Sequence, residues 1–393
     1  MKTAGIICEC NPLHAGHIHL MDAARRGGAD AIVCVMSGCF VQRGEAAIAD
    51  PYARAEILVH AGADAVVELP FPYSASSAEF FGAAGVDILS RLGVDELWFG
   101  SECGDLELLS RMARVADDPA FVARYSETVQ GNSGTARAYF ECMKEFCGED
   151  TCSPNDILAL SYLRAIEKHG SRMRPVTIRR VGSGYSETEL KKDAFPSATA
   201  LRRAWRTDGL DAIVPFLPDA CATVLLREAS KHRAPADLRH AERLILGTLR
   251  AQSADTTENY EGLGGGLAGR LKSAAENAHS LDELLSLATT KKYPDARLRR
   301  GILAAMVGVT AEDVRAKASY VRLLAANKSG CAYLAALRHA SEIAVVTRQG
   351  DLPTDASTER QHALEAREKS LYSLCLPDIG VARELYCRAP VIL

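Results

Sequence analysis

Short apolar runs alternate with amphipathic segments in a regular order over the first half of the chain. Runs bounded by polar or glycine-containing turns predict strands, and apolar residues spaced three and four positions apart predict helices between them. The predicted strands are residues 4–10, 31–36, 64–69, 96–100 and 174–180, and the predicted helical segments are 15–26, 51–61, 75–92, 107–146, 155–169 and 197–205. This βαβ order indicates an α/β domain with a parallel sheet covered by helices on both faces.

In the second half of the chain, apolar residues recur mainly at the spacing of an α-helix. Predicted helices span residues 220–231, 241–251, 266–278, 281–289, 295–307 and 333–342, and a polar interruption covers 352–358. We therefore expect the α/β domain to end near residue 205. The chain divides into residues 1–205, the catalytic domain, and residues 206–393, a mainly helical C-terminal domain.

The composition is that of a folded protein without a membrane span. Of the 393 residues, 48% are apolar, which excludes a disordered chain. The longest apolar runs are far shorter than the roughly 20 residues needed to cross a bilayer. The chain begins Met-Lys-Thr-Ala without an apolar signal segment, so a cytosolic, cytoplasmic location is expected.

The twelve cysteines form no CxxC pair and no regular disulfide framework, so we expect them to be reduced. Cys142, Cys147 and Cys152 lie five residues apart, but no histidine pair or fourth close ligand accompanies them. No metal site in the protein is predicted.

Charge is distributed unevenly along the chain. Residues 1–170 hold 13 Lys and Arg against 24 Asp and Glu, whereas residues 171–393 hold 33 against 26. This asymmetry is compatible with a polyanion bound by the second half while chemistry takes place in the first, and a chance distribution of solvated charge is the alternative.

The motif that carries the chemistry lies where the first strand turns into its helix. Cys10 to His17 read Cys-Asn-Pro-Leu-His-Ala-Gly-His, an H-x-G-H element. At this point of an open α/β sheet, free backbone N–H groups and the helix dipole favour a phosphate. Gly16 allows the backbone to approach it closely, and His14 and His17 can donate to oxygens whose charge grows in the transition state. The alternative is that both imidazoles cap or pack the first helical turn.

Five further segments follow predicted strands or begin helices. The second predicted strand is followed by Ser37-Gly38 and by Gln42-Arg43-Gly44-Glu45. Within this loop Arg43 is the candidate cation that would bind the triphosphate, the carboxylate or the incoming nucleophile. Gly100 ends the fourth strand, where an adenine or ribose can approach. Asn155 stands at a helix start and Arg180 at a strand end, and Ser197 to Thr199 open another helix. Capping is the alternative for the helix starts.

Two stretches of the second half contain residue types that are typical of ligand binding, and we keep one of them as a candidate. Residues 262–269 resemble a glycine-rich dinucleotide fingerprint, but no strand precedes them and we reject that interpretation. Lys291, Lys292, Arg297, Arg299 and Arg300 make a basic stretch suited to phosphate contacts without sequence readout. A solvated helix face is the alternative.

Taken together, the motifs are specific enough to resemble a known family. They are Gly5 to His17, Met36 to Gly38, Phe40 to Glu45, Val67 to Tyr73, Phe99 to Glu102, Pro154 to Leu158, Gly182 to Tyr185, Ser197 to Ala200 and Arg297 to Arg300. Across nearly the whole chain they look like the bacterial tRNA(Met) cytidine acetate ligases of the HxGH nucleotidyltransferase-like superfamily. The resemblance implies a Rossmann-like, HUP-type nucleotidyltransferase domain followed by a mainly helical domain that binds tRNA. The polyanion suggested by the charge distribution would then be tRNA.

The resemblance also implies an activity and a set of site residues. Acetate and ATP would form acetyl-adenylate with release of pyrophosphate. The acetyl group would then pass to the exocyclic amine of the wobble cytidine in elongator methionine tRNA. No DNA or membrane partner is expected. Mg²⁺ is expected with ATP on electrostatic grounds. The residues that would bind ATP are Ile7, Cys8, Glu9, Cys10, Asn11, Pro12, Leu13, His14, Ala15, Gly16, His17, Ile18, His19, Leu20, Gly100, Asn155 and Arg180, with His14, His17 and Arg43 catalytic.

Five positions depart from the family pattern: Cys10 replaces an aromatic residue, Leu13 a Phe, Ala15 and Cys39 an Asn, and Ala46 a Pro. Two rival functions remain. A small-molecule adenylyltransferase shares the H-x-G-H element, but the basic helical extension argues against it. A non-catalytic tRNA-binding protein would not need His14, His17, Arg43 and Arg180.

Overall fold

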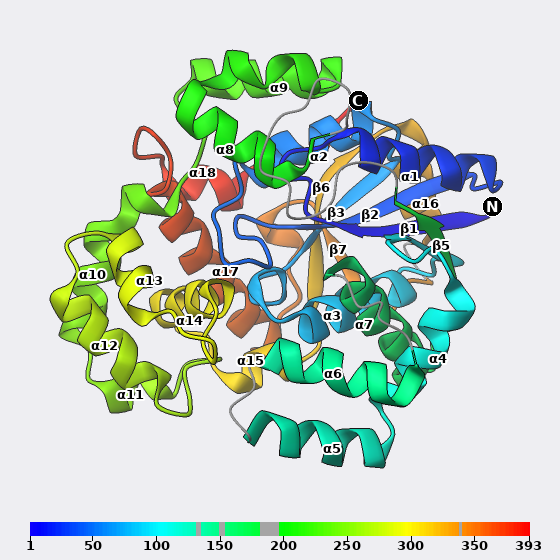
Figure 1. Cartoon of the computed structure of the whole chain (residues 1–393). Coiled ribbons are helices and arrows are strands. Elements are labelled where there is room, and N and C mark those ends of the chain that lie inside the picture. The colour runs from blue at the N-terminus through cyan, green and yellow to red at the C-terminus, as the bar shows by residue number, and fades with distance from the viewer. Residues whose placement is uncertain (131–134, 149–153, 181–195, 338–339) are drawn as a thin grey trace.

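A computed structural model describes residues 1–130, 135–148, 154–180, 196–337 and 340–393 (Figure 1). Within these ranges eight strands form one sheet in the order β5-β4-β1-β2-β3-β6-β7, with β8 paired to β6. The strands are β1 (Thr3–Cys8), β2 (Ala31–Ser37), β3 (Ala65–Leu69), β4 (Glu96–Ser101), β5 (Arg174–Arg179), β6 (Tyr320–Ala326), β7 (Ala344–Val346) and β8 (Val391–Ile392).

The five strands of the first half are parallel, as the βαβ order predicts. β1 pairs with β2 over its full length, from Thr3 opposite Ala31 to Cys8 opposite Met36, and with β4 on its other side. Strand order reverses about β1, because the chain leaves toward β2 and β3 and returns to β4 and β5. Such a reversal opens a crevice beyond the carboxyl ends of the strands, and ligands of α/β proteins bind there.

Helices cover both faces of the sheet. Apolar residues of α1 (Ala15–Arg26), α2 (Pro51–His60), α8 (Ala198–Asp208) and α9 (Asp219–Ser230) pack on one face. The other face is covered by α3 (Ala78–Arg91), α4 (Leu106–Ala116), α7 (Pro154–Lys168) and α16 (Lys328–Leu337), with α5 (Pro119–Gln130) and α6 (Thr135–Cys147) outside them. No helix within the described ranges is long and apolar enough to cross a membrane.

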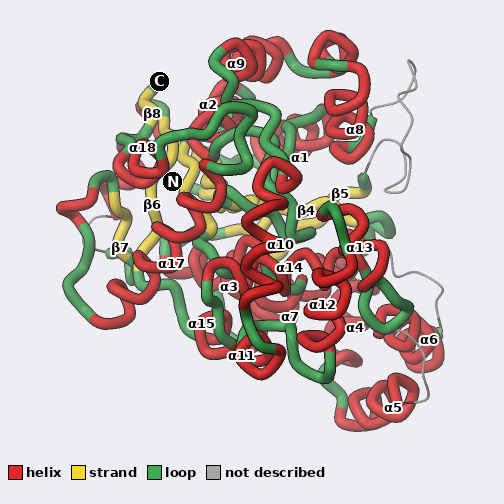
Figure 2. Tube along the Cα trace, turned by 90° about the vertical axis from the view of Figure 1, so that its left-hand side faces the viewer, coloured by secondary structure: helices red, strands yellow, loops and turns green. Residues whose placement is uncertain are grey.

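A separate apolar core lies under the helices of the second half, most of which lie to the left of the sheet in Figure 1 and toward the viewer in Figure 2. Its helices are α10 (Glu242–Ala251), α11 (Ala254–Glu258), α12 (Leu267–Asn277), α13 (Leu281–Ala288), α14 (Asp295–Val307), α15 (Ala311–Arg315), α17 (Ala356–Ser373) and α18 (Ala382–Cys387). Phe40 and Phe71, from loops that follow β2 and β3, also enter this core. The helical group is thereby packed directly against the carboxyl edge of the sheet.

The expectation that the α/β part ends near residue 205 is wrong for the last strands. β6 runs antiparallel to β3, and β7 and β8 pair with β6, so the sheet is mixed and its far edge comes from the end of the chain. α9 also packs on the sheet rather than among the later helices. All seven residues of β6 are buried, and apart from Arg322 they are apolar, so periodicity alone cannot distinguish this run from a buried helix.

Candidate active site

A cavity of about 250 Å³ opens at the carboxyl ends of β1, β4 and β5, where the strand order reverses. Most residues predicted to bind ATP line it, together with Arg43. They are Ile7, Cys8, Glu9, Cys10, Asn11, His14, Gly16, His17, His19, Leu20, Gly100, Asn155 and Arg180. The structure therefore brings together loops that are 170 residues apart in the sequence.

Four residues of the predicted ATP loop do not line this cavity: Pro12, Leu13, Ala15 and Ile18. Leu13 packs in the core between the sheet and α1, where it is 1% exposed. Of the five departures from the family pattern, only Cys10 lines the cavity. Cys39 and Ala46 are buried in the core of the helical group, so these substitutions change packing around the site rather than its lining.

His14 and His17 hold the first turn of α1 between them. His14 is the N-cap residue, and its Nδ1 accepts the backbone N–H of Gly16 at 3.1 Å. In return, Nδ1 of His17 accepts the backbone N–H of His14 at 3.3 Å, and the two ring centroids lie 4.1 Å apart. This is a reciprocal capping box built from two imidazoles. The capping interpretation is correct, but it uses only one nitrogen of each ring.

The second nitrogen of each ring remains for a ligand. Burial, with the nearby charges of His17 and Arg180, holds the pKa of His14 well below its ordinary value, and burial lowers the pKa of His17 too. Both rings are therefore neutral near pH 7. Since Nδ1 accepts a backbone hydrogen bond, the single proton of each neutral ring lies on Nε2. Two Nε2–H donors thus belong to side chains that line the same cavity.

Gly16 is required by the close approach of His14. A Cβ atom at residue 16 would lie 2.9 Å from Cε1 and 3.1 Å from Nδ1 of the His14 ring. Any larger residue would displace the imidazole from its capping position. The glycine of the H-x-G-H element thus fixes the ring that faces the ligand.

The opposite side of the cavity joins β4, β5 and α7. Arg180 donates from Nη1 to Oδ1 of Asn155 at 3.2 Å, and Asn155 donates from Nδ2 to Glu102. Gly100 lies against the Arg180 side chain. Phe81, Phe99, Leu158, Tyr162 and Ile178 add an apolar wall. This combination suits a flat heterocycle beside a charged phosphate chain.

A buried arginine that the sequence analysis did not select holds the loops after β1 and β2 together. Arg54 of α2 is 1% exposed and donates to the backbone oxygens of Glu9 at 2.6 Å, Ser37 at 2.9 Å and Ala49 at 2.9 Å, and also to that of Gly38. A guanidinium has five donors in a fixed plane, so one side chain can fix several carbonyls at once. The only available signal was an arginine within an otherwise apolar helix face.

Arg202 of α8 makes a second link that sequence reasoning did not assign to the site. Its Nη1 donates to the backbone oxygen of Asn11 at 2.8 Å, and its Nη2 lies 3.1 Å from Oε2 of Glu45. Arg202 lines the cavity, and Glu45 lines a neighbouring one. Together they form the wall between the two cavities.

The predicted basic stretch separates into two groups. Lys291 and Lys292 are exposed, and Lys292 and Arg297 each lie 5.2 Å from the centre of the Tyr293 ring. Arg299 pairs with Asp295 at 2.7 Å, whereas Arg300 donates from Nη1 to the backbone oxygen of Gln42 at 3.1 Å. Arg300 therefore supports the loop that carries Arg43.

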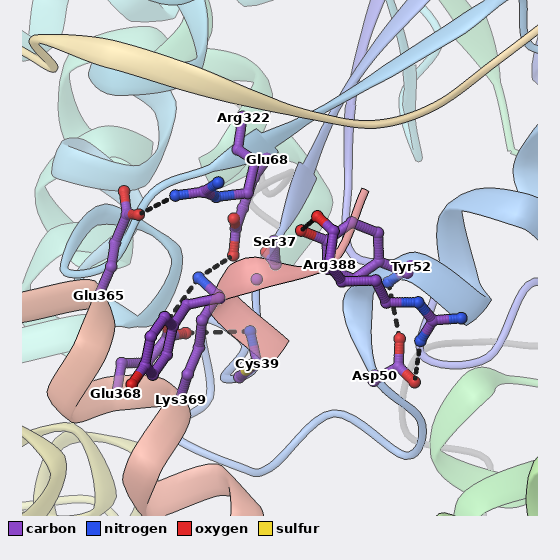
Figure 3. A network of polar contacts seen from close by, with 12 residues as sticks. Ser37, Cys39, Asp50, Tyr52, Glu68, Arg322, Glu365, Glu368, Lys369 and Arg388 are labelled. Carbon is purple, nitrogen blue, oxygen red and sulfur yellow. Dashed lines mark hydrogen bonds and ion pairs between the residues drawn. The ribbon is translucent and has the colours of Figure 1, made fainter. Parts of the chain in front are cut away.

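Behind the loop after β2 lies a group of charged side chains that we call the buried ionic cluster: Glu68, Arg322, Glu365, Glu368 and Lys369 (Figure 3). Each is at most 1% exposed. Lys369 Nζ lies 2.9 Å from Glu68 Oε1 and 3.5 Å from Glu368 Oε2, and Glu368 Oε1 accepts the backbone N–H of Cys39 at 3.0 Å. Only Glu68 lies within a sequence motif, Val67 to Tyr73, and no motif joins the members of the cluster, because they lie on β3, β6 and α17.

Some sequence-based candidates lie outside the described residues, namely Cys152 and the segment Gly182 to Tyr185. Cys142 and Cys147 lie on α6. Within the described ranges, no group of three His, Cys, Asp or Glu side chains is arranged to hold a metal ion.

The chain is similar to proteins of known name. The family described as HIGH Nucleotidyl Transferase matches residues 1–384. A tRNA(Met) cytidine acetate ligase of Acetivibrio thermocellus is 31% identical over 95% of both chains, and one of Caldicellulosiruptor bescii is 33% identical over 96% of this chain and 95% of its own.

Solved structures give the same result. The apo crystal structure of Thermotoga maritima TmcAL superposes with a TM-score of 0.93 at 28% identity over 100% of both chains. The crystal structure of Thermotoga maritima TmcAL bound with alpha-thio ATP superposes with a TM-score of 0.90 at 29% identity, also over 100% of both chains.

Proposed function

Because this chain belongs to the HIGH nucleotidyl transferase family, and within it to the tRNA(Met) cytidine acetate ligases, we propose that it activates acetate with ATP and acetylates a tRNA. Acetyl-adenylate forms first with release of pyrophosphate. The acetyl group then passes to the exocyclic amine of the wobble cytidine of elongator methionine tRNA. As a tRNA-modifying enzyme it would act in the cytoplasm.

The observation that carries the proposal is the imidazole capping box at the start of α1. In the first step an acetate oxygen forms a bond to the α-phosphorus, and the bond from that phosphorus to the pyrophosphate oxygen breaks. Negative charge grows on the phosphate oxygens during this step. His14 and His17 would donate from Nε2–H to these oxygens, and donors fixed in advance stabilise growing charge strongly.

The positions of the remaining lining residues support the same assignment. Arg43, Arg180 and Arg202 would balance the triphosphate and the acetate carboxylate. Gly100 and the apolar wall would take the adenine. The alpha-thio ATP named for the T. maritima relative supports ATP as the nucleotide here.

We propose that Mg²⁺ enters as part of the ATP complex. In the described lining Glu9 is the carboxylate, and its Oε1 already accepts the backbone N–H of Gln42 at 2.8 Å. A cation bound mainly through phosphate oxygens and water needs no carboxylate cluster from the protein. The protein residues fit such a substrate complex.

We propose that residues 206–393 supply most of the tRNA contacts, through Lys291, Lys292 and Arg297 in particular. These groups lie on the loop before α14 and on α14 itself, and α14 touches the catalytic loop. Gly44 has a φ of +72°, and a Cβ at this residue would lie 2.6 Å from the backbone nitrogen of Arg300. RNA held on this side would thus lie next to the cavity.

The test uses the purified full chain with ATP, Mg²⁺ and labelled acetate, followed by tRNA. The expected result is acetate-dependent exchange of pyrophosphate into ATP, and label in tRNA once tRNA is added. Exchange without tRNA labelling would favour a small-molecule adenylyltransferase. A chain that binds tRNA and gives neither signal would be a non-catalytic binding protein.

A further inference from the structure

The carboxylate of Glu9 has no role in the steps described so far. Glu9 follows β1 directly, and its side chain is the carboxylate in the described lining of the cavity. Oε1 accepts the backbone N–H of Gln42 at 2.8 Å, which fixes the direction of the carboxylate. Oε2 is not among the buried side-chain oxygens that lack a hydrogen bond, and the residue is partly exposed. One oxygen is thus anchored while the side chain still faces the cavity.

Glu9 is also linked through Gln42 to α14, the helix that follows the basic stretch. The backbone N–H of Gln42 bonds to Glu9, and its backbone oxygen accepts Nη1 of Arg300 from α14 at 3.1 Å. A single residue therefore separates Glu9 from the helix that we propose to contact tRNA. A tRNA nucleotide that enters the cavity from the side of α14 would meet Glu9 before it meets the wall formed by β4 and α7.

The second half-reaction requires a group that accepts a proton. The exocyclic amine of cytidine is neutral, and its nitrogen gains a positive charge as it bonds to the acetyl carbon. A positioned base with a pKa near the working pH contributes about 10²–10⁴-fold to such a step. The base must have a free lone pair and lie in the cavity.

Most of the other lining side chains do not meet this requirement. The Nδ1 lone pairs of His14 and His17 already accept backbone N–H groups. The arginines stay protonated. Burial raises the pKa of Tyr162 far above its ordinary value, and the sulfur of Cys8 contacts Cys10 and Cys34 within the core. Glu9 and His19 remain among the described lining residues, and of these His19 is exposed on α1, whereas Glu9 is anchored to the loop after β2.

The surroundings of Glu9 raise its affinity for a proton, as a general base in this step requires. Burial raises its pKa, although the Gln42 N–H, Arg202 and Arg43 partly oppose this effect and Glu45 adds to it. Tyr162 of α7 lines the same cavity, and the charge of Glu9 helps to raise the pKa of its hydroxyl. A carboxylate with a raised pKa binds a proton more readily than an exposed one.

We propose that Glu9 is the general base of acetyl transfer, an assignment that rests on the proposed function. The cytidine nitrogen forms its bond to the acetyl carbon, and the bond from that carbon to the phosphate oxygen of AMP breaks. The amine proton moves to Oε2 of Glu9 and is later released to water. The products are N-acetylated cytidine and AMP.

The test separates the two half-reactions in a Glu9→Gln variant. The amide oxygen of Gln still accepts the Gln42 N–H, so the loop keeps its anchor while the base is lost. Acetate-dependent exchange of pyrophosphate into ATP, which reports any contribution of Glu9 to ATP binding, should persist and fall much less than the transfer step. Single-turnover transfer from preformed acetyl-adenylate to tRNA should fall by about 10²-fold or more. An Asp22→Asn variant removes the same charge from the exposed face of α1 and should leave both rates unchanged.

The pH profile distinguishes a base from a structural contact. Wild-type transfer should rise with pH through the pKa of Glu9 and then level, and the variant should lose this rise. If Glu9→Gln abolishes pyrophosphate exchange as well, or keeps both half-reactions, Glu9 is not the base of transfer. Failure of the proposed function itself looks different, because the wild-type protein would then give no exchange or no labelled tRNA.

Discussion

Two polar regions lie on either side of the loop after β2, and they use charge in opposite ways. The cavity brings His14, His17, Arg43 and Arg180 to a surface that a ligand can reach. The buried ionic cluster lies behind the same loop and is closed to solvent, with cations and carboxylates within 3.7 Å of each other. Charges that face a cavity act on a ligand, whereas charges that face one another hold the fold.

The two regions also differ in how far apart their parts lie in the sequence. The capping box joins residues three positions apart, whereas the pair Lys369 and Glu68 joins residues 301 positions apart. We therefore expect substitutions in the cavity to reduce activity with little loss of stability. Substitutions in the cluster should do the reverse.

The largest effect is expected from Lys369→Met. Removing the ammonium leaves Glu68 and Glu368 buried without their cation, and breaking a buried pair in this way costs about 3–5 kcal/mol of unfolding free energy. Urea unfolding measures the change. Lys231→Met, at an exposed lysine at the end of α9, serves as the control and should change stability by less than about 0.5 kcal/mol. A loss below about 1 kcal/mol for Lys369→Met would mean that the cluster is not a stabilising unit.

His17→Ala tests the cavity side of the comparison. Losing one fixed donor to the growing charge should lower the rate of pyrophosphate exchange by about 10²–10³-fold, which corresponds to about 2.7–4 kcal/mol in the transition state. The lost cap should cost only about 1 kcal/mol of stability. Exchange kinetics and urea unfolding measure the two quantities. His60→Ala, at the exposed end of α2, is the matched control, and full exchange in His17→Ala would contradict the site.

The same contrast explains which parts of the molecule could be predicted from sequence. The bounds of α1 and α14 were predicted correctly at Ala15–Arg26 and Asp295–Val307, because caps and apolar spacing are local signals. Most of the cavity was predicted as well, since its residues follow parallel strands and such ends meet at one edge of a sheet.

The parts that could not be predicted depend on distant partners. No helix was assigned over Ala356–Ser373, because Glu365, Glu368 and Lys369 look like solvated residues until Glu68 and Arg322 are placed beside them. β6 has no turn signal linking it to β3, although the two strands pair across the sheet. Arg54 is similar, because its four acceptors are backbone oxygens that carry no sequence signal.

A smaller effect is expected from the pH dependence of the cluster. Burial raises the pKa of Glu368 from 4.5 to about 7, so between these values the folded protein holds a proton that the unfolded chain has released. Stability should therefore fall as pH rises through this window, by about 2–3 kcal/mol, and level above it. Glu368→Gln keeps an acceptor for the Cys39 N–H and should remove this slope. Urea unfolding from pH 5 to 8 compares the two proteins, and equal slopes would show that Glu368 is ionised throughout.

The smallest effect is expected from exposed lysines of the second half. It tests whether these charges bind a ligand, as those of the cavity do, or only contribute to the fold, as those of the buried ionic cluster do. Lys291 and Lys292 are exposed, so charges that contact RNA phosphates should contribute to affinity in a salt-dependent way. A Lys291→Ala, Lys292→Ala double variant should reduce the slope of log binding constant against log salt by about 1–2. Pyrophosphate exchange should not change, since neither lysine lines the cavity. Removing two exposed charges elsewhere, with Arg26→Ala and Lys231→Ala, should leave the slope as it is. If both double variants give the wild-type slope, the loop before α14 is a solvated surface and the tRNA lies on another face.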